Sequence, residues 1–285
     1  MGIVVVWIFV LLVVLAVVAG VRPAGRAEID GFAAAAGIQT TETSRRFIGH
    51  YLATSRRRRT VLVVAALVLP GLVAEALGVH RTGYSAPLQW VLVACMLGTL
   101  WAELTLTRPS APQRAASLLP RRPAAYLARP LRWGPAVAGL ASAAVWLGVP
   151  FLPEPQPGDW LLPSSLEVAV AVAVGLIVPV LATAAECWIL ARPQPVVSED
   201  LLVADHAVRA SSVRMVAAMA TIMGLGNLVG GLVTYSGALP GPLAAVCAVL
   251  TVASLIGCLA AWSFRRSGVA PLPHELRREP ERAAT

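Results

Sequence analysis

The chain has 285 residues, a formal net charge of +8 and 57% hydrophobic residues, and only 13% of its residues are charged. Soluble domains usually carry about 25% charged residues, so the composition excludes an ordinary soluble globule, a disordered chain and a disulfide-rich secreted module. It is typical of a helical membrane protein.

A membrane-spanning helix needs about 20 apolar residues to cross a hydrocarbon core of ~30 Å. Segments of this kind occur seven times, so we expect an all-α, polytopic bundle of about seven transmembrane helices. The expected spans are 3–20, 60–79, 87–107, 134–152, 165–191, 213–235 and 240–264. The corresponding domains are an anchor at 1–21, an Arg-rich juxtamembrane segment at 22–59, a six-helix bundle at 60–264 and a charged tail at 265–285.

The first span resembles a signal peptide in length, but it lacks the basic residues that precede the apolar core of such peptides. Arg22 and Arg26 follow the apolar run instead. This order favours an uncleaved anchor with its N-terminus outside the cell and, after seven spans, a cytoplasmic C-terminus.

The arginines agree with that orientation. All 23 basic residues are arginine, and the seven spans place 22 of them on the inner side and only Arg81 in an outer turn. This bias is the positive-inside pattern. Amphipathic indoles prefer the headgroup level, and four tryptophans fall near the expected inner boundary: Trp101, Trp133, Trp188 and Trp262.

Spans two to seven are expected to form three tandem hairpins, each of which starts on the inner side. Glu103 and Glu186 are each followed by an Arg-Pro pair and, 15 residues after the glutamate in both cases, by a Leu-Leu pair. The match indicates a decayed duplication, although two Arg-Pro helix ends can also match by chance in a chain of this composition.

Residues 44–59 are predicted to form an amphipathic helix on the inner leaflet, with apolar side chains at helical spacing among arginines. Because this segment directly precedes a span, anionic lipid is a better partner for it than nucleic acid. The expected lipid-binding residues are Arg45, Arg46, Arg56, Arg57, Arg58 and Arg59.

Carboxylates inside a bilayer are costly and are therefore candidates for function. Ser164 and Glu167 have the spacing of a helix capping box, which explains that acid structurally. Glu75 lies near the outer end of its span, where it either points outward to pair with His80 or Arg81 or forms an outward-facing cation or proton site.

Glu103 and Glu186 are the candidate functional pair, because the apparent repeat places them at equivalent positions. Two neighbouring carboxylates can share a proton or hold a cation. The structural alternative is that each pairs with an arginine at the inner boundary, such as Arg132 or Arg214, and locks two helices together.

Span six contains Gly226 and Gly230 on either side of Asn227. Small residues at this spacing allow close helix packing, and an asparagine can hydrogen-bond across the contact. Asn227 is therefore expected to be a polar packing residue, with contact to a substrate as the alternative.

A short helix is predicted at 198–209, before span six, with Asp205 and Arg209 as an i,i+4 pair. Asp200, Asp205 and His206 are a thin ligand set, so no metal site is predicted. No cofactor is expected either.

The familiar nucleotide-binding, hydrolase and metalloprotease motifs do not occur in the sequence, so no enzyme activity is expected. We expect a permease-like component of a transport system that lacks its own ATPase, with a separate ATPase or other partner docked at loops 108–133 and 192–212. The alternative is a non-transporting anchor or regulatory protein that binds cytoplasmic partners. Arginine without lysine, beside abundant alanine and proline, is typical of a GC-rich bacterial genome, so the expected location is a bacterial plasma membrane.

Overall fold

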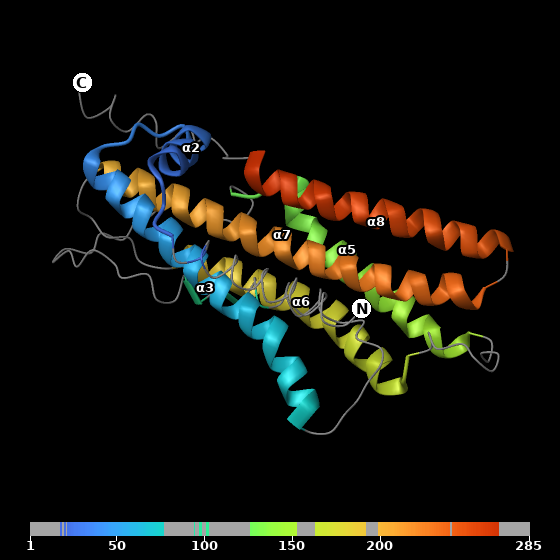
Figure 1. Cartoon of the computed structure of the whole chain (residues 1–285). Coiled ribbons are helices and arrows are strands. Elements are labelled where there is room, and N and C mark those ends of the chain that lie inside the picture. Colours follow the sequence, from blue (N-terminus) through green and yellow to red (C-terminus); the bar gives the residue numbers. More distant parts are fainter. Residues whose placement is uncertain are drawn as a thin grey trace. The chain divides into compact units, whose positions relative to one another are not determined.

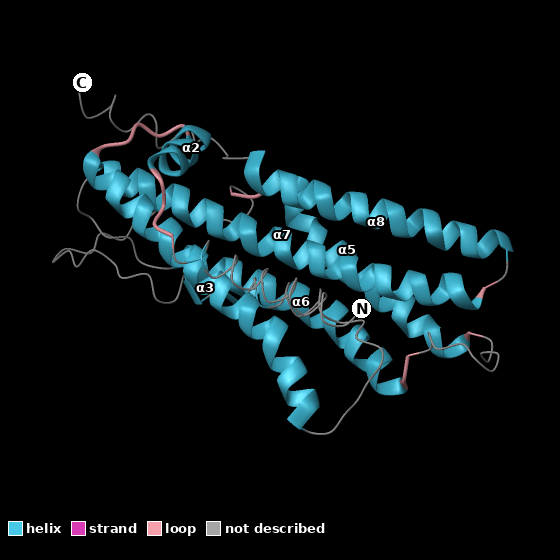
Figure 2. Ribbon diagram, viewed as in Figure 1, coloured by secondary structure: helices cyan, strands magenta, loops and turns pink. Residues whose placement is uncertain are grey.

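A computed structural model describes residues 22–76, 126–152, 163–191, 199–239 and 241–267, together with the single positions 18, 20, 94, 97, 98, 101 and 102. Within these ranges the regular structure is helical (Figures 1 and 2). The all-α prediction is therefore confirmed for the described part of the chain.

The first two described helices are α2, Arg26–Ala36, and α3, Glu42–Ala76. Sequence analysis did not predict α2, which ends at Gly37, a residue with a left-handed backbone (φ 63°) that suits a helix C-terminus. The expected amphipathic segment and span two are one continuous helix, α3. No proline interrupts the sequence between them, so the helix has no reason to end at the membrane boundary.

Helix α5, Arg129–Gly148, continues into a short 3-10 turn, η2, at Val149–Phe151. It begins before the expected start at residue 134, because the proline after Arg129 lies in the first turn, where its missing N–H is not needed. Helix α6, Ser165–Ala191, has the expected bounds. Its N-terminus carries the predicted capping box: the Ser164 N–H donates to Glu167 Oε2 at 2.7 Å, and the Glu167 N–H donates to Ser164 Oγ at 3.3 Å.

Helix α7, Glu199–Ala238, and helix α8, Gly241–Ser267, complete the described chain. The expected short helix at 198–209 and span six at 213–235 are a single helix of 40 residues, about 60 Å long. The prediction of two helices was wrong because the residues between them, Ala210 to Ser212, include no helix breaker.

Four described helices are long and apolar enough to cross a membrane. Their spanning parts are Arg129–Phe151, Ser165–Ala191, Leu201–Ala238 and Gly241–Ser263. Large apolar side chains stay exposed along α6 and α8, among them Leu176, Val180, Val249 and Leu259. Such surfaces are compatible with lipid contact. Spans one and three lie mostly outside the described residues, so the count of seven spans stays a prediction.

The chain forms two compact units. Unit 1 comprises Met1–Ala125, Ile189–Ser212 and Val269–Thr285, and unit 2 comprises Tyr126–Trp188 and Val213–Gly268.

The core of unit 1 joins α2, α3 and the first part of α7. Ile29, Ile48 and Ala204 form a buried apolar cluster, one residue from each helix. Nearby, the hydroxyls of Tyr51 and Ser212 share a buried hydrogen bond of 2.8 Å. The apolar face of the amphipathic segment is thus covered by protein.

Unit 2 is packed through glycines. A Cβ on Gly139 of α5 would lie 2.4 Å from the carbonyl oxygen of Gly175 and 2.5 Å from Pro179 Cγ, both on α6. Pro179 has no N–H to donate to the Gly175 carbonyl one turn earlier, so that oxygen is left to pack against the Cα of Gly139. On α7, Gly224 makes a similarly close approach to α5.

Candidate functional site

The described acid that remains unexplained by packing is Glu186 on α6. Buried residues recur along one face of this helix at spacings of three and four: Ala171, Gly175, Val178, Ala182 and Glu186. The Glu186 residue is 7% exposed, so its carboxyl group lies within unit 2 on the same face as the others. The sequence predicted Glu186 as a candidate from the apparent repeat, but that repeat contains no information about the residues that surround it.

The expected arginine partners of Glu186 are engaged elsewhere. Arg214 is buried on α7, and its Nε donates to the Tyr126 carbonyl oxygen at 3.1 Å. The Arg132 guanidinium lies over the ring of its neighbour Trp133, 5.5 Å from the ring centroid. Within the described part of the chain, no hydrogen bond or ion pair joins the Glu186 carboxylate to another side chain or carbonyl.

The other two candidate carboxylates lie outside what the structure describes in detail. Glu103 is outside the described residues, so its proximity to Glu186 stays a prediction. Glu75 belongs to the last turn of α3, and its side chain is outside the described part. The apparent repeat after Glu103 and Glu186 likewise falls mostly on residues that are not described.

Asn227 joins three helices of unit 2. It is 1% exposed, and its Nδ2 donates to Ser142 Oγ on α5 at 2.7 Å and to the Ala171 carbonyl on α6 at 2.8 Å. Its own backbone carbonyl accepts a hydrogen bond from the indole Nε1 of Trp146 at 2.8 Å. This geometry supports the packing interpretation of Asn227.

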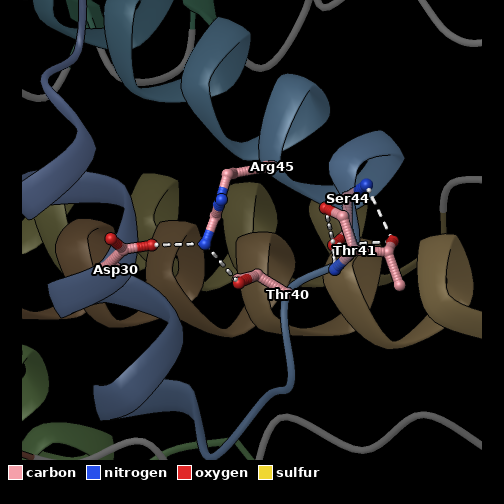
Figure 3. A network of polar contacts seen from close by, with 5 residues as sticks. All are labelled: Asp30, Thr40, Thr41, Ser44 and Arg45. Carbon is pink, nitrogen blue, oxygen red and sulfur yellow. Dashed lines mark hydrogen bonds and ion pairs between the residues drawn. The ribbon is translucent and has the colours of Figure 1, made fainter.

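The first of the expected lipid-binding arginines lies at the start of α3 (Figure 3). Thr41 and Ser44 cap the helix: the Thr41 N–H donates to Ser44 Oγ at 2.9 Å, and the Ser44 N–H donates to Thr41 Oγ1 at 3.3 Å. Arg45 Nη2 lies 3.3 Å from Asp30 Oδ1 on α2 and donates to Thr40 Oγ1. Arg45 therefore joins α2 to α3.

Two further arginines of this set form ion pairs. Arg46 pairs with Glu42 one turn earlier, and both side chains are largely exposed. Arg56 pairs with Glu28 of α2. Arg57 is exposed. Arg46 and Arg57 are therefore the two arginines of the set that are most accessible to a lipid headgroup.

Of the last two arginines, Arg58 contacts another segment of unit 1, and Arg59 bonds to its own helix. Arg58 Nη1 donates to the Trp101 carbonyl at 2.7 Å, and its guanidinium lies 5.1 Å from the centroid of the Trp101 ring. Arg59 Nε donates to the Ser55 carbonyl at 3.1 Å and Nη2 to Ser55 Oγ at 2.7 Å. Much of the predicted lipid-binding charge thus also holds unit 1 together.

The arginine of a buried ion pair in unit 1 also contacts the end of another helix, which the sequence did not predict. Arg209 Nε lies 2.7 Å from Asp205 Oδ2, as the i,i+4 spacing predicted, and the Arg209 residue is only 2% exposed. Its Nη1 also donates to the Ile189 carbonyl at 3.3 Å. Ile189 lies in the last turn of α6, where carbonyls lack helical donors, so Arg209 caps that helix.

Among the described residues, no group of three or more His, Cys, Asp or Glu side chains is placed to hold a metal ion. Comparisons with known protein families, with characterised proteins and with solved structures find no match to this chain. The four apolar helices are compatible with a membrane protein, and any more specific function has to be inferred from the residues themselves.

Proposed function

We propose that this protein is a multi-pass bacterial plasma-membrane protein and the permease-like membrane component of a transport system, with its N-terminus outside. The observation that carries the proposal is Glu186, which is buried on a helix able to cross a membrane and has no partner among the described residues. Ionisable groups within membrane helices commonly mark proton or ion pathways. Glu103 is the proposed second carboxylate of that pathway.

The energy source in this proposal is an ion gradient or a separate ATPase, since the sequence has no nucleotide-binding motif. Most side chains of α7 between Leu201 and Ser212 are buried. Of the two expected docking segments, 108–133 is therefore the better surface for a cytoplasmic partner. Residues 126–133 are the part of that segment that the structure describes. Arg129 and Arg132 are exposed there and are accessible to a partner.

The second candidate function is a non-transporting anchor or regulator. The contacts that favour it are the Asn227 hydrogen bonds and the close approach of Gly139 to Gly175, which hold α5, α6 and α7 in one arrangement. On this alternative, partners would bind at the exposed basic residues of unit 1, such as Arg46 and Arg57.

Reconstituted protein distinguishes the two functions. Proteoliposomes would be given an inward proton gradient and a potassium diffusion potential, and the uptake of labelled amino acids, sugars, nucleosides and metal cations would be measured against protein-free vesicles. Transport predicts that at least one solute accumulates with the wild type, and that Glu186→Gln abolishes this accumulation.

Glu167→Gln is the matched control, because it removes one carboxylate from the same helix while glutamine preserves the capping box. It should transport like the wild type. Folded wild-type protein that accumulates no solute would favour the anchor, and equal uptake by wild type and Glu186→Gln would remove Glu186 from the mechanism.

A further inference from the structure

We propose that the Glu186 carboxyl is a proton-binding site that holds its proton in the resting protein. The proton adds to one carboxylate oxygen, and the side chain changes from a charge of −1 to neutral. The ion that binds at this site is thus a proton. A role for that proton in coupled transport rests on the transport function proposed above.

The surroundings of Glu186 on its own helix are apolar. Val178 and Ala182 precede it on the buried face of α6, and the residue itself is 7% exposed. An ionised carboxylate without a partner is expensive in such a place, whereas a neutral carboxyl is much less so. Glu186 lies five residues, or about 7.5 Å of helix rise, before the end of α6 at Ala191.

Charge compensation from the rest of unit 2 is limited. The other charged or titratable groups of unit 2 whose side chains are described are Tyr126, Arg129, Arg132, Glu167, Cys187, Arg214, Tyr235, Cys247 and Cys258. Glu167 belongs to the cap at the opposite end of α6, and Arg129 and Arg132 are exposed. Arg214 is therefore the one buried cation among these groups.

Arg214 lies near the level of Glu186 along the bundle. The hydrogen bond from Asn227 to the Ala171 carbonyl sets the register of α7 against α6. Successive helices joined by a short segment run antiparallel, and both rise about 1.5 Å per residue. Moving 15 residues from Ala171 to Glu186 therefore corresponds to moving back along α7 from Asn227 to Ser212, two residues or about 3 Å from Arg214. The Arg214 guanidinium nevertheless donates to the Tyr126 carbonyl.

A proton suits this site better than a metal cation. Hard cations such as calcium take six to eight oxygen ligands at about 2.3–2.6 Å. The other buried residues on the Glu186 face of α6 offer no side-chain oxygen: Ala171, Gly175, Val178, Ala182 and Ile189. One carboxyl group is sufficient for a proton.

Loss of the proton would create a buried negative charge in unit 2. Arg214 makes no ion pair with Glu186 in the described structure, so one of the two side chains has to move before Arg214 can neutralise that charge. Release of the proton is thereby linked to a movement of the Glu186 or Arg214 side chain, and Arg214 contacts the Tyr126 carbonyl, three residues before the start of α5.

Infrared spectroscopy of the full-length protein in lipid vesicles tests the site directly, without any transported solute. At neutral pH the wild type should show the carbonyl stretch of a protonated carboxylic acid, shifted in D₂O. Glu186→Gln should lose this band, and Glu167→Gln should retain it. Identical acid bands in wild type and Glu186→Gln would show that Glu186 is ionised and would overturn the proposal.

Two further measurements complete the test. Because glutamine has the size and neutrality of a protonated glutamate, Glu186→Gln should fold like the wild type, and failure to fold contradicts a neutral resting side chain. Glu186→Asp keeps a titratable carboxyl and should show a shifted acid band. Loss of the wild-type band on adding sodium or calcium chloride would identify a cation as the occupant and refute the proton site.

The outcomes separate this proposal from the transport function. An acid band assigned to Glu186 in a protein without solute uptake would refute transport and leave the proton site standing. Solute uptake that depends on Glu186, in a protein without that band, would refute the proton site alone.

Discussion

Asn227 and Glu186 are both buried polar residues of unit 2, and their surroundings differ completely. The side-chain amide of Asn227 reaches Ser142 and the Ala171 carbonyl, so its buried donors are satisfied. Glu186 has no such partner among the described residues. A satisfied polar group fixes a structure, whereas an unsatisfied one is a candidate for binding.

Asn227→Ala should lower the stability of the bundle. Interhelical hydrogen bonds in membrane proteins contribute about 0.6 kcal/mol on average and up to about 1.7 kcal/mol, so the loss of two should amount to about 1–3 kcal/mol. Thermal unfolding in detergent measures this change. Thr251→Val is the control, because the Thr251 hydroxyl donates to the Cys247 carbonyl within α8, at 2.9 Å, and this bond joins no second helix. Unchanged stability together with lost uptake would make Asn227 a substrate contact instead.

At the scale of helices, α5 and α6 approach closely because glycines occupy both sides of their contact. Neither Gly139 nor Gly175 leaves room for a side chain: a Cβ on Gly175 would lie 2.8 Å from the Gly139 carbonyl oxygen. This is the small-residue packing that membrane helices use in place of a hydrophobic driving force.

Gly139→Ala should separate α5 from α6. The new methyl group would overlap the Gly175 carbonyl and the Pro179 ring, and overpacking of this kind typically destabilises by about 1–3 kcal/mol. Gly230→Ala is the matched control, because its nearest neighbour, Trp146 Cζ2, is 3.4 Å away. Comparison of thermal unfolding midpoints checks the prediction, and equal midpoints for the two variants would contradict the close contact.

Arg209→Gln should destabilise unit 1 strongly. The substitution leaves Asp205 buried without its cation and removes a donor from the Ile189 carbonyl. Breaking a buried pair in this way costs roughly 3–5 kcal/mol.

The exposed pair gives the control for this substitution. Arg46→Gln removes the ion pair with Glu42 and should cost no more than about 0.5 kcal/mol. Adding Asp205→Asn to Arg209→Gln should restore part of the lost stability, since the uncompensated charge is then gone. A double variant that is no more stable than Arg209→Gln alone would show that the cap on α6, rather than the charge, accounts for the effect.

For the whole molecule, the distribution of arginine determines the proposed orientation. The 22 arginines on the predicted inner side oppose translocation, and Arg81 is the single exception. Three tryptophans of unit 2, at the ends of α5, α6 and α8 that are predicted to face inward, are 39–60% exposed, as interfacial residues should be: Trp133, Trp188 and Trp262.

Cysteine accessibility tests the orientation in intact cells. In a background without the native cysteines, Asp159→Cys should react with a membrane-impermeant maleimide, and Ser267→Cys should react only after the cells are opened. The reverse pattern would invert the topology. Reaction of both positions in intact cells would place both outside the cell. It would contradict the three spans predicted between them, because an odd number of spans puts the two positions on opposite sides.

Most helices could be predicted from the sequence, because apolar length is a local property. The bounds of α6 and its cap at Ser164 and Glu167 were confirmed. Errors arose where helices continue beyond the apolar segment, as in α3 and α7, since a polar stretch without a helix breaker does not end a helix. Helix α2 was missed because it is short and too polar on one side to resemble a span.

By itself, the sequence predicted helices compatible with a membrane protein, the positions of the four apolar helices described and the Asp205–Arg209 pair, because these depend on composition and on spacing within one helix. Only the tertiary structure decided which polar groups are satisfied. The partners of Arg209 and Asn227 include carbonyls on another helix, and Arg214 bonds to a carbonyl far from it in the sequence. The physical reason is that a carboxylate and an arginine form an ion pair only when the packing of helices brings them within contact distance. No spacing along the chain shows that the packing leaves Glu186 without an arginine partner among the described residues.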